Sequence, residues 1–162
     1  MSGGRSVYRL RDEPQPGVLA KLAVEPLWPL LALMLAGAWL GFPWLALNAV
    51  AVGSPTKKRE FLLVTTAVLG SLALGLGLLH GLKAGYIPSE NVLPYALLVL
   101  VVWKLSLGYA LFSLQSETIE LYRYYGGVLS RFGLPVMLVG AFVLRPVVLG
   151  LLSSPLWYLV VS

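Results

Sequence analysis

The sequence contains no cysteine and only one histidine, His80. Without cysteine the chain forms no disulfide and offers no thiolate to zinc, to an iron–sulfur cluster or to catalysis. A single imidazole without neighbouring acids is a poor metal site, so we interpret His80 as a packing or interfacial residue. We therefore expect neither a metal nor a cofactor.

Charge is also scarce. Only 12% of the 162 residues are charged, against about 25% in soluble domains. Hydrophobic residues make up 58% and the mean hydropathy is +0.83. A soluble chain of this length needs more charge to cover its surface, so we expect the lipid bilayer to surround this one. The net charge of +5 comes from basic residues at chain ends and in loops, which suits anionic head groups rather than nucleic acid.

Long runs without charge set the fold class. Thirty-one uncharged residues separate Glu25 from Lys57, and twenty-two separate Glu60 from Lys83. A membrane-spanning helix needs about 20 mostly apolar residues. The pattern predicts an all-α, multi-pass membrane protein, with a polar tail at 1–25 and one helical membrane domain at 26–162. We expect four membrane elements at about 27–52, 60–82, 94–114 and 133–152, an amphipathic interfacial helix at about 115–126, and a short C-terminal tail along the interface.

The first of these elements contains Gly41-Phe42-Pro43, where we expect a kink or a break. Its thirty-one residues are too few for two full spans of at least about 17 residues each. The element is therefore either a kinked span or a re-entrant one. A simple span leaves five Lys or Arg residues on each side, whereas re-entry leaves nine on one side and one on the other. The positive-inside rule favours the second arrangement, and both stay open.

Small residues recur at helical spacing in the first two elements. Such rows let helix backbones approach closely where lipid supplies no hydrophobic drive for association. The residues predicted to pack helices are Gly37, Gly41, Ala73, Gly77 and Gly81, with a second row at Ala67, Ser71 and Gly75.

Two cations, Lys104 and Arg145, fall near the middle of predicted spans. A cation at the centre of a membrane helix costs about 2.5–3.5 kcal/mol on insertion scales. One explanation is snorkelling, or pairing with carbonyls from the 41–43 break or with Asn48. The other is an anion that the chain does not supply: a lipid phosphate, an anionic substrate or a partner's carboxylate. The candidate anion or partner contacts are thus Lys104, Arg145 and Asn48.

The acids are expected in turns or beyond the ends of the spans, at Glu60, Glu90, Glu117 and Glu120. A proton-coupled pump usually needs a carboxylate inside the membrane, and a magnesium-dependent lipid phosphotransferase needs clustered acids. Both classes are disfavoured, and we expect no catalytic residue.

One stretch carries a family resemblance. Ala36-Gly37-Ala38, followed by Leu45-Ala46-Leu47-Asn48-Ala49-Val50-Ala51-Val52-Gly53-Ser54-Pro55-Thr56-Lys57-Lys58-Arg59, resembles a group of small, uncharacterised bacterial helical membrane proteins. There a small-residue helix ends in an asparagine, a short apolar stretch, Gly-x-Pro and a basic turn. The group's paired glycine before proline is here only Gly41-Phe42-Pro43. The resemblance implies a bacterial inner-membrane location and no activity.

These features lead to three functional hypotheses. The first is a non-enzymatic accessory or scaffold subunit, which packs through its small-residue rows against a membrane-protein partner or another copy of itself. The alternative is a small oligomeric transporter or channel, suggested by Pro43 and Asn48 in a broken first element. The second alternative is a lipid-acting membrane enzyme, which would depend on His80 and the segment 117–123.

Overall fold

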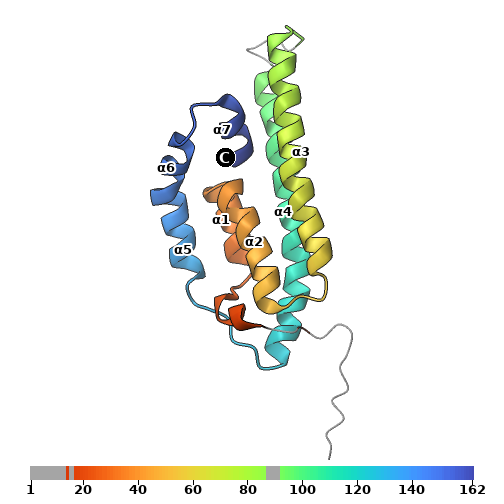
Figure 1. The fold of residues 1–162 in the computed structure, drawn as a ribbon, viewed down its shortest axis with the longest axis vertical. Coiled ribbons are helices and arrows are strands. Elements are labelled where there is room, and N and C mark those ends of the chain that lie inside the picture. The colour runs from red at the N-terminus through yellow and green to blue at the C-terminus, as the bar shows by residue number, and fades with distance from the viewer. Residues whose placement is uncertain (1–13, 15–16, 87–91) are drawn as a thin grey trace, which may run out of the picture.

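The computed structural model describes Pro14, residues 17–86 and residues 92–162. Within these ranges the regular elements are helices and no strand is present, which confirms the all-α class. Three helical runs are long and apolar enough to cross a membrane: α3 (Lys57–Lys83), α4 (Leu93–Tyr124) and the run Gly133–Gly150. Figure 1 shows α3 and α4 side by side, with the shorter elements beside them.

The first apolar run forms two helices that fold back on each other. Two residues, Ala36 and Gly37, separate helix α1 (Leu27–Leu35) from helix α2 (Ala38–Val52). Gly37 lies between them with φ of +112°, a backbone conformation that favours glycine. The helices approach closely, because a Cβ added at Gly41 would lie 2.5 Å from the Leu33 Cα atom. The run is therefore a helical hairpin whose tip is Ala36–Gly37.

The expected break at Gly41-Phe42-Pro43 is wrong, since α2 continues through Pro43. Proline lacks the N–H that would reach the Trp39 carbonyl, which removes one helical hydrogen bond but does not turn the chain here. The reversal occurs four residues earlier than Gly41, at Gly37. There the Trp39 indole donates to the Ala36 carbonyl at 2.8 Å and caps the end of α1.

The segments predicted as a span at 94–114 and an interfacial helix at 115–126 form one helix, α4. No proline or glycine interrupts the chain between Gly108 and Gly126. In the amphipathic half, Ile119 and Tyr122 are buried in a cluster with Ala51 and Val52 of α2. The prediction of a separate interfacial helix is therefore wrong, because this half continues α4 and packs one face against α2.

The last apolar run, predicted as a span at 133–152, is helical over Gly133–Gly150 with one irregular turn. It consists of α5 (Gly133–Val139), a π-helical turn η2 (Gly140–Leu144) and α6 (Arg145–Gly150). The Arg145 N–H donates to the Gly140 carbonyl, five positions earlier. Pro146 follows and has no N–H to continue the α pattern, so the wider π turn fits before it.

The C-terminal residues form α7 (Pro155–Val161), which turns back into the bundle. Helix α7 packs against α3, where a Cβ added at Gly75 would lie 3.1 Å from Leu156. Its end reaches the hairpin tip, where a Cβ at Gly37 would lie 2.5 Å from the Val161 carbonyl oxygen. The expectation of a tail along the interface is wrong, because this segment has its own inward-facing contacts.

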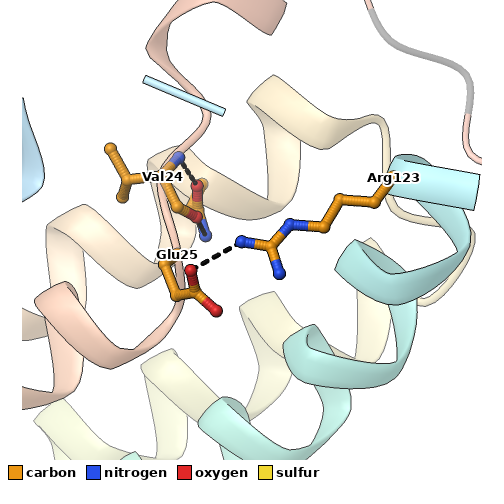
Figure 2. A network of polar contacts seen from close by, with 4 residues as sticks. Val24, Glu25 and Arg123 are labelled. Atoms are coloured by element: carbon orange, nitrogen blue, oxygen red, sulfur yellow. Dashed lines mark hydrogen bonds and ion pairs between the residues drawn. The ribbon is translucent and has the colours of Figure 1, made fainter. Parts of the chain in front are cut away.

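The start of α1 and the end of α2 lie at the same end of the bundle. The Val24 backbone bonds to the side chain of Asn48 near the end of α2. Next to it, Arg123 at the end of α4 pairs with Glu25 at 2.6 Å, as Figure 2 shows. In Figure 1 the hairpin rises from this end, and α7 approaches it from the other. This ion pair joins the start of the hairpin to the end of α4.

Only one of the two small-residue rows on α3 packs within the chain. Ala67, Ser71 and Gly75 are buried, whereas Ala73 and Gly77 are exposed. Nothing lies within 4 Å of a Cβ added at Gly77. Among the described residues, Ala73 and Gly77 of the row predicted to pack helices therefore face outward, unlike Gly37 and Gly41, whereas Gly81 is half-buried.

Candidate functional site

Lys104 lies at the meeting point of the hairpin and α7. It is the twelfth residue of α4, which has 32 residues, and only 5% of it is exposed. Its Nζ atom donates to the carbonyl oxygens of Leu159 at 2.7 Å and of Ser162 at 2.6 Å. Lys104 thus binds the last turn of α7, whose carbonyls have no partner within their own helix.

Arg145 makes the corresponding contact with the end of α1. Its Nη1 atom donates to the Leu35 carbonyl oxygen at 2.8 Å, across 110 positions of sequence. The residue is partly exposed. Each of the two central cations therefore caps the carboxyl end of a short helix. Carbonyl pairing was one of the two explanations that the sequence left open, but the carbonyls come from α1 and α7 and not from residues 41–43.

Lys104 and Arg145 also line one cavity of about 250 Å³. Its other lining residues are Leu33, Met34, Val101, Leu105 and Ser162. Met34 is 56% exposed and Val101 is 47% exposed, so the cavity opens to the outside of the bundle beside α1 and α4. A larger cavity of about 340 Å³ lies beside α2 and is lined by apolar residues and Ser130. Charge is therefore concentrated at the first cavity.

Asn48, the third predicted contact, lies elsewhere. Its Oδ1 atom accepts from the Val24 N–H at 2.9 Å, and its Nδ2 atom donates to the Val24 carbonyl and to Gln115 Oε1, each at 3.1 Å. These bonds hold the base of the hairpin against α4. The structure thus brings Lys104 and Arg145 together but separates Asn48 from them.

Gln115 connects Asn48 to a buried carboxylate, Glu60. Gln115 Nε2 donates to the Leu45 carbonyl at 2.6 Å and to Glu60 Oε2 at 2.7 Å. The Glu60 Oε1 atom accepts from the hydroxyls of Ser54 and, at 2.9 Å, of Thr56. Every polar atom of this chain of contacts has a partner, which is the condition for burying such groups at low cost.

Glu60 was expected in a turn outside the span. It lies instead in the first turn of α3 and is fully buried. Three neutral donors and the amino end of α3 stabilise its charge there. A carboxylate does therefore lie inside the bundle, although it faces the hairpin base and not Lys104.

Sequence reasoning missed Gln115 and Glu60 as partners. The signal for Gln115 is present, because the buried face of α4 runs through Leu100, Lys104, Gly108, Leu111, Gln115, Thr118 and Tyr122 at steps of three and four. Leu121 and Tyr125, on the other side of the helix, are exposed. For Glu60 the signal was the pair of hydroxyl residues just before α3, Ser54 and Thr56, which both donate to its carboxylate.

His80 lies on α3 and is exposed. The described residues contain no group of three or more His, Cys, Asp or Glu side chains that could hold a metal ion. Within the described residues His80 therefore belongs to no such cluster.

Comparison with known proteins gives no relative. No family model matches the chain, and neither a curated protein nor a solved structure is significantly similar to it.

Proposed function

We propose that this chain is a multi-pass membrane protein that works as a small transporter or channel. Three runs cross the bilayer: α3, α4 and the run 133–150. The α1–α2 hairpin and α7 enter from opposite sides and end against each other near its middle. The chain works in a bacterial inner membrane, as the resemblance of its hairpin implies.

The close approach of Gly37 and α7 is the observation that carries this proposal. A Cβ at Gly37 would lie 2.5 Å from the Val161 carbonyl oxygen, so two broken elements meet inside the bundle. Irregular backbone at membrane depth is tolerated only where protein buries it or where it lines a water-filled cavity. Transporters use such discontinuous helices to form their binding sites. The cavity lined by Lys104 and Arg145 beside the junction supports a water-filled site here.

The charge distribution supports the same topology. With a re-entrant hairpin, the N-terminal tail, the turn at 57–59 and the segment after α4 share one side. That side carries nine of the ten Lys and Arg residues outside the spans, and the opposite side carries Lys83 alone. Basic residues collect on the cytoplasmic side, so this side is cytoplasmic.

An accessory or scaffold subunit is the second candidate. The observation that favours it is the exposed pair Ala73 and Gly77 on α3; no described residue lies within 4 Å of a Cβ added at Gly77. Rows of this kind allow close contact with another membrane helix. In that case the junction of the hairpin and α7 is a packed structural element without water.

Cysteine accessibility distinguishes the two candidates, and the natural sequence has no cysteine to interfere. Met34→Cys places a thiol in the cavity. Val102→Cys is the matched control, because Met34 and Val102 are 56% and 53% exposed but Val102 does not line the cavity. We expect small water-soluble methanethiosulfonate reagents to modify Met34→Cys and to leave Val102→Cys unmodified in membrane vesicles.

A Met34→Cys variant that stays unmodified would contradict the transporter or channel and support the scaffold. Modification of both thiols at similar rates would contradict the membrane placement itself.

A further inference from the structure

We propose that an apolar groove between α2 and the start of the run 133–150 holds one acyl chain of an anionic phospholipid, with the lipid phosphate beside Lys21 and Arg131. The inference rests on the membrane placement in the proposed function but goes beyond it, because it holds for a transporter and for a scaffold alike. It assigns a specific lipid site to the cytoplasmic leaflet.

The groove consists of two adjoining cavities, of about 340 Å³ and about 240 Å³. Leu40 of α2 and Val136 of α5 line both cavities, so the cavities meet at these two side chains. The first extends from there to Leu47 and Phe132, and the second extends to Leu144. The groove therefore follows the run 133–150 from just before α5 to the end of the π-helical turn η2.

The groove exists because α5 packs on α1 and leaves part of α2 uncovered. A Cβ added at Gly133 would collide with the Trp28 side chain of α1. Figure 1 shows the run 133–150 on the side of the hairpin away from α3 and α4. On the walls of the groove Pro43 is exposed, and Leu47 and Val136 are 42% and 43% exposed. At membrane depth these side chains face hydrocarbon rather than water, so the groove opens to acyl chains.

The length of the groove matches one leaflet of the bilayer. Phe132 and Leu144 are twelve positions apart, which is about 18 Å at the helical rise. Half of a hydrocarbon core of about 30 Å is about 15 Å, the depth that the acyl chains of one leaflet reach. An acyl chain that enters at the cytoplasmic end of the run 133–150 would therefore fill the groove to its far end.

The volume favours an acyl chain over a helix of another protein. One turn of α-helix, about 10 Å across and about 5.4 Å long, occupies about 420 Å³. Each cavity is smaller than this, although the groove extends along several turns of α5 and η2. A narrow, flexible hydrocarbon chain fits such a space, whereas a partner helix would only cover it from outside.

Basic residues at the cytoplasmic end of the groove indicate the head group. Arg131 directly follows the lining residue Ser130. Lys21 directly precedes the lining residue Leu22. The Ser130 N–H donates to the Ala23 carbonyl at 2.7 Å, so the two segments that carry these cations are joined.

Both cations are exposed, and neither takes part in the ion pair that the described residues contain. Basic residues at the cytoplasmic surface attract anionic head groups. A phosphate bound by Lys21 and Arg131 would lie at the entrance of the groove, in line with an acyl chain inside it. Tail and head group of one lipid thus account for both features.

The test is native mass spectrometry of the full chain, delipidated in detergent and titrated with one phospholipid at a time. Phosphatidylglycerol and phosphatidylcholine with identical acyl chains are compared by the apparent Kd of the first lipid bound. We expect phosphatidylglycerol to bind about tenfold more tightly, because two basic residues attract its negative charge. Lys21→Gln combined with Arg131→Gln should remove this preference. Lys57→Gln combined with Lys58→Gln removes two exposed cations before the hydrophobic part of α3 and should leave it unchanged.

Val136→Trp tests the groove itself, because the indole would fill the space where the two cavities meet. Both lipids should then bind severalfold more weakly. Leu138→Trp is the matched control, since Leu138 and Val136 are 42% and 43% exposed but Leu138 lines neither cavity. Its lipid affinities should equal those of the natural sequence. Helical circular dichroism checks that both variants keep their fold.

Equal affinities for the two lipids, or a preference that survives the loss of Lys21 and Arg131, would overturn the lipid site. Lipid binding that Val136→Trp leaves unchanged would also overturn it, and a dimer that this variant disrupts would identify a second copy as the cover. None of these results alters the labelling of Met34→Cys, so the proposed function would stand. Conversely, an unmodified Met34→Cys protein with intact phosphatidylglycerol binding would reject the transporter and keep the lipid site.

Discussion

The side-chain amide of Asn48 donates to the side-chain oxygen of Gln115 at 3.1 Å, across 67 positions of sequence. This bond joins α2 to α4 directly. Through Gln115 it also reaches Glu60 on α3, so one glutamine connects three helices. The base of the hairpin is therefore held by polar contacts, whereas its tip is held by close backbone packing.

Gln115→Leu should destabilise the chain. It leaves Glu60 Oε2 and the Leu45 carbonyl without the donor that each now has, and an unsatisfied buried group costs about 1–3 kcal/mol. Unfolding in detergent, followed by helical circular dichroism, measures the loss. Ser113→Ala, at an exposed position of α4, should change stability by no more than about 0.5 kcal/mol. Equal effects of the two substitutions would refute this role for Gln115.

Gly37→Ala should be strongly destabilising, whereas Gly77→Ala should be neutral or stabilising. Gly37 has φ of +112° and no room for a Cβ beside Val161, but Gly77 has nothing within 4 Å. Alanine also gains about 0.5–1 kcal/mol over glycine inside a helix. Thermal unfolding of both purified variants provides the comparison. A Gly37→Ala protein with the stability of the natural sequence would rule out the tight tip.

Lys104→Leu should release α7. Lys104 donates to the backbone oxygens of Leu159 and Ser162, and leucine has no donor to replace these bonds. Amide hydrogen exchange should accelerate in residues 156–161 and stay slow in the centre of α3. Lys83→Leu, at an exposed position, should change neither region. Unchanged exchange in α7 would mean that α3 packing alone keeps it in place.

The two ends of the hairpin should face the same side of the membrane. Val18 is 97% exposed before α1, and Thr56 directly precedes α3. Single cysteines at both positions should react with an impermeant maleimide only from the cytoplasmic side. Tyr86→Cys, at a residue that is 82% exposed after α3, should react only from the other side. Labelling of positions 18 and 56 from opposite sides would contradict this topology and support a first element that crosses the membrane as a kinked span.

The long helices were predictable from sequence because uncharged runs of sufficient length leave few alternatives in lipid. The range predicted for α3, 60–82, differs from Lys57–Lys83 by three residues or fewer at each end. The re-entrant form was one of the two alternatives left open, but its turn was expected at residues 41–43 and lies at Gly37. Pro43 gives a strong local signal in the sequence, whereas the positive φ of Gly37 gives none. A proline inside a helix costs one hydrogen bond, and the surrounding contacts compensated for that loss here.

The candidate site was predictable only in part. Lys104 and Arg145 stood out because cations are rare in apolar runs, and this signal is local. Their carbonyl partners were hidden, because Leu159 and Leu35 lie 55 and 110 positions away. All residues have the same main-chain carbonyl group, so the residue type does not predict which carbonyl a buried cation will bind.

The contact between Gly37 and Val161 has a consequence for how the protein is made. The ribosome adds Gly37 to the growing chain 124 residues before Val161, so the hairpin is synthesised long before α7. During that interval the tip of the hairpin has no contact with α7, and the Leu35 carbonyl has no hydrogen bond from Arg145. The N–H and carbonyl of Gly37 are already bonded within the hairpin, but lipid offers no donor to the Leu35 carbonyl and no packed surface to the tip, so the nascent hairpin is incomplete until translation is nearly finished. A chain stalled before Pro155 would expose the uncovered tip, which quality-control proteases could then recognise.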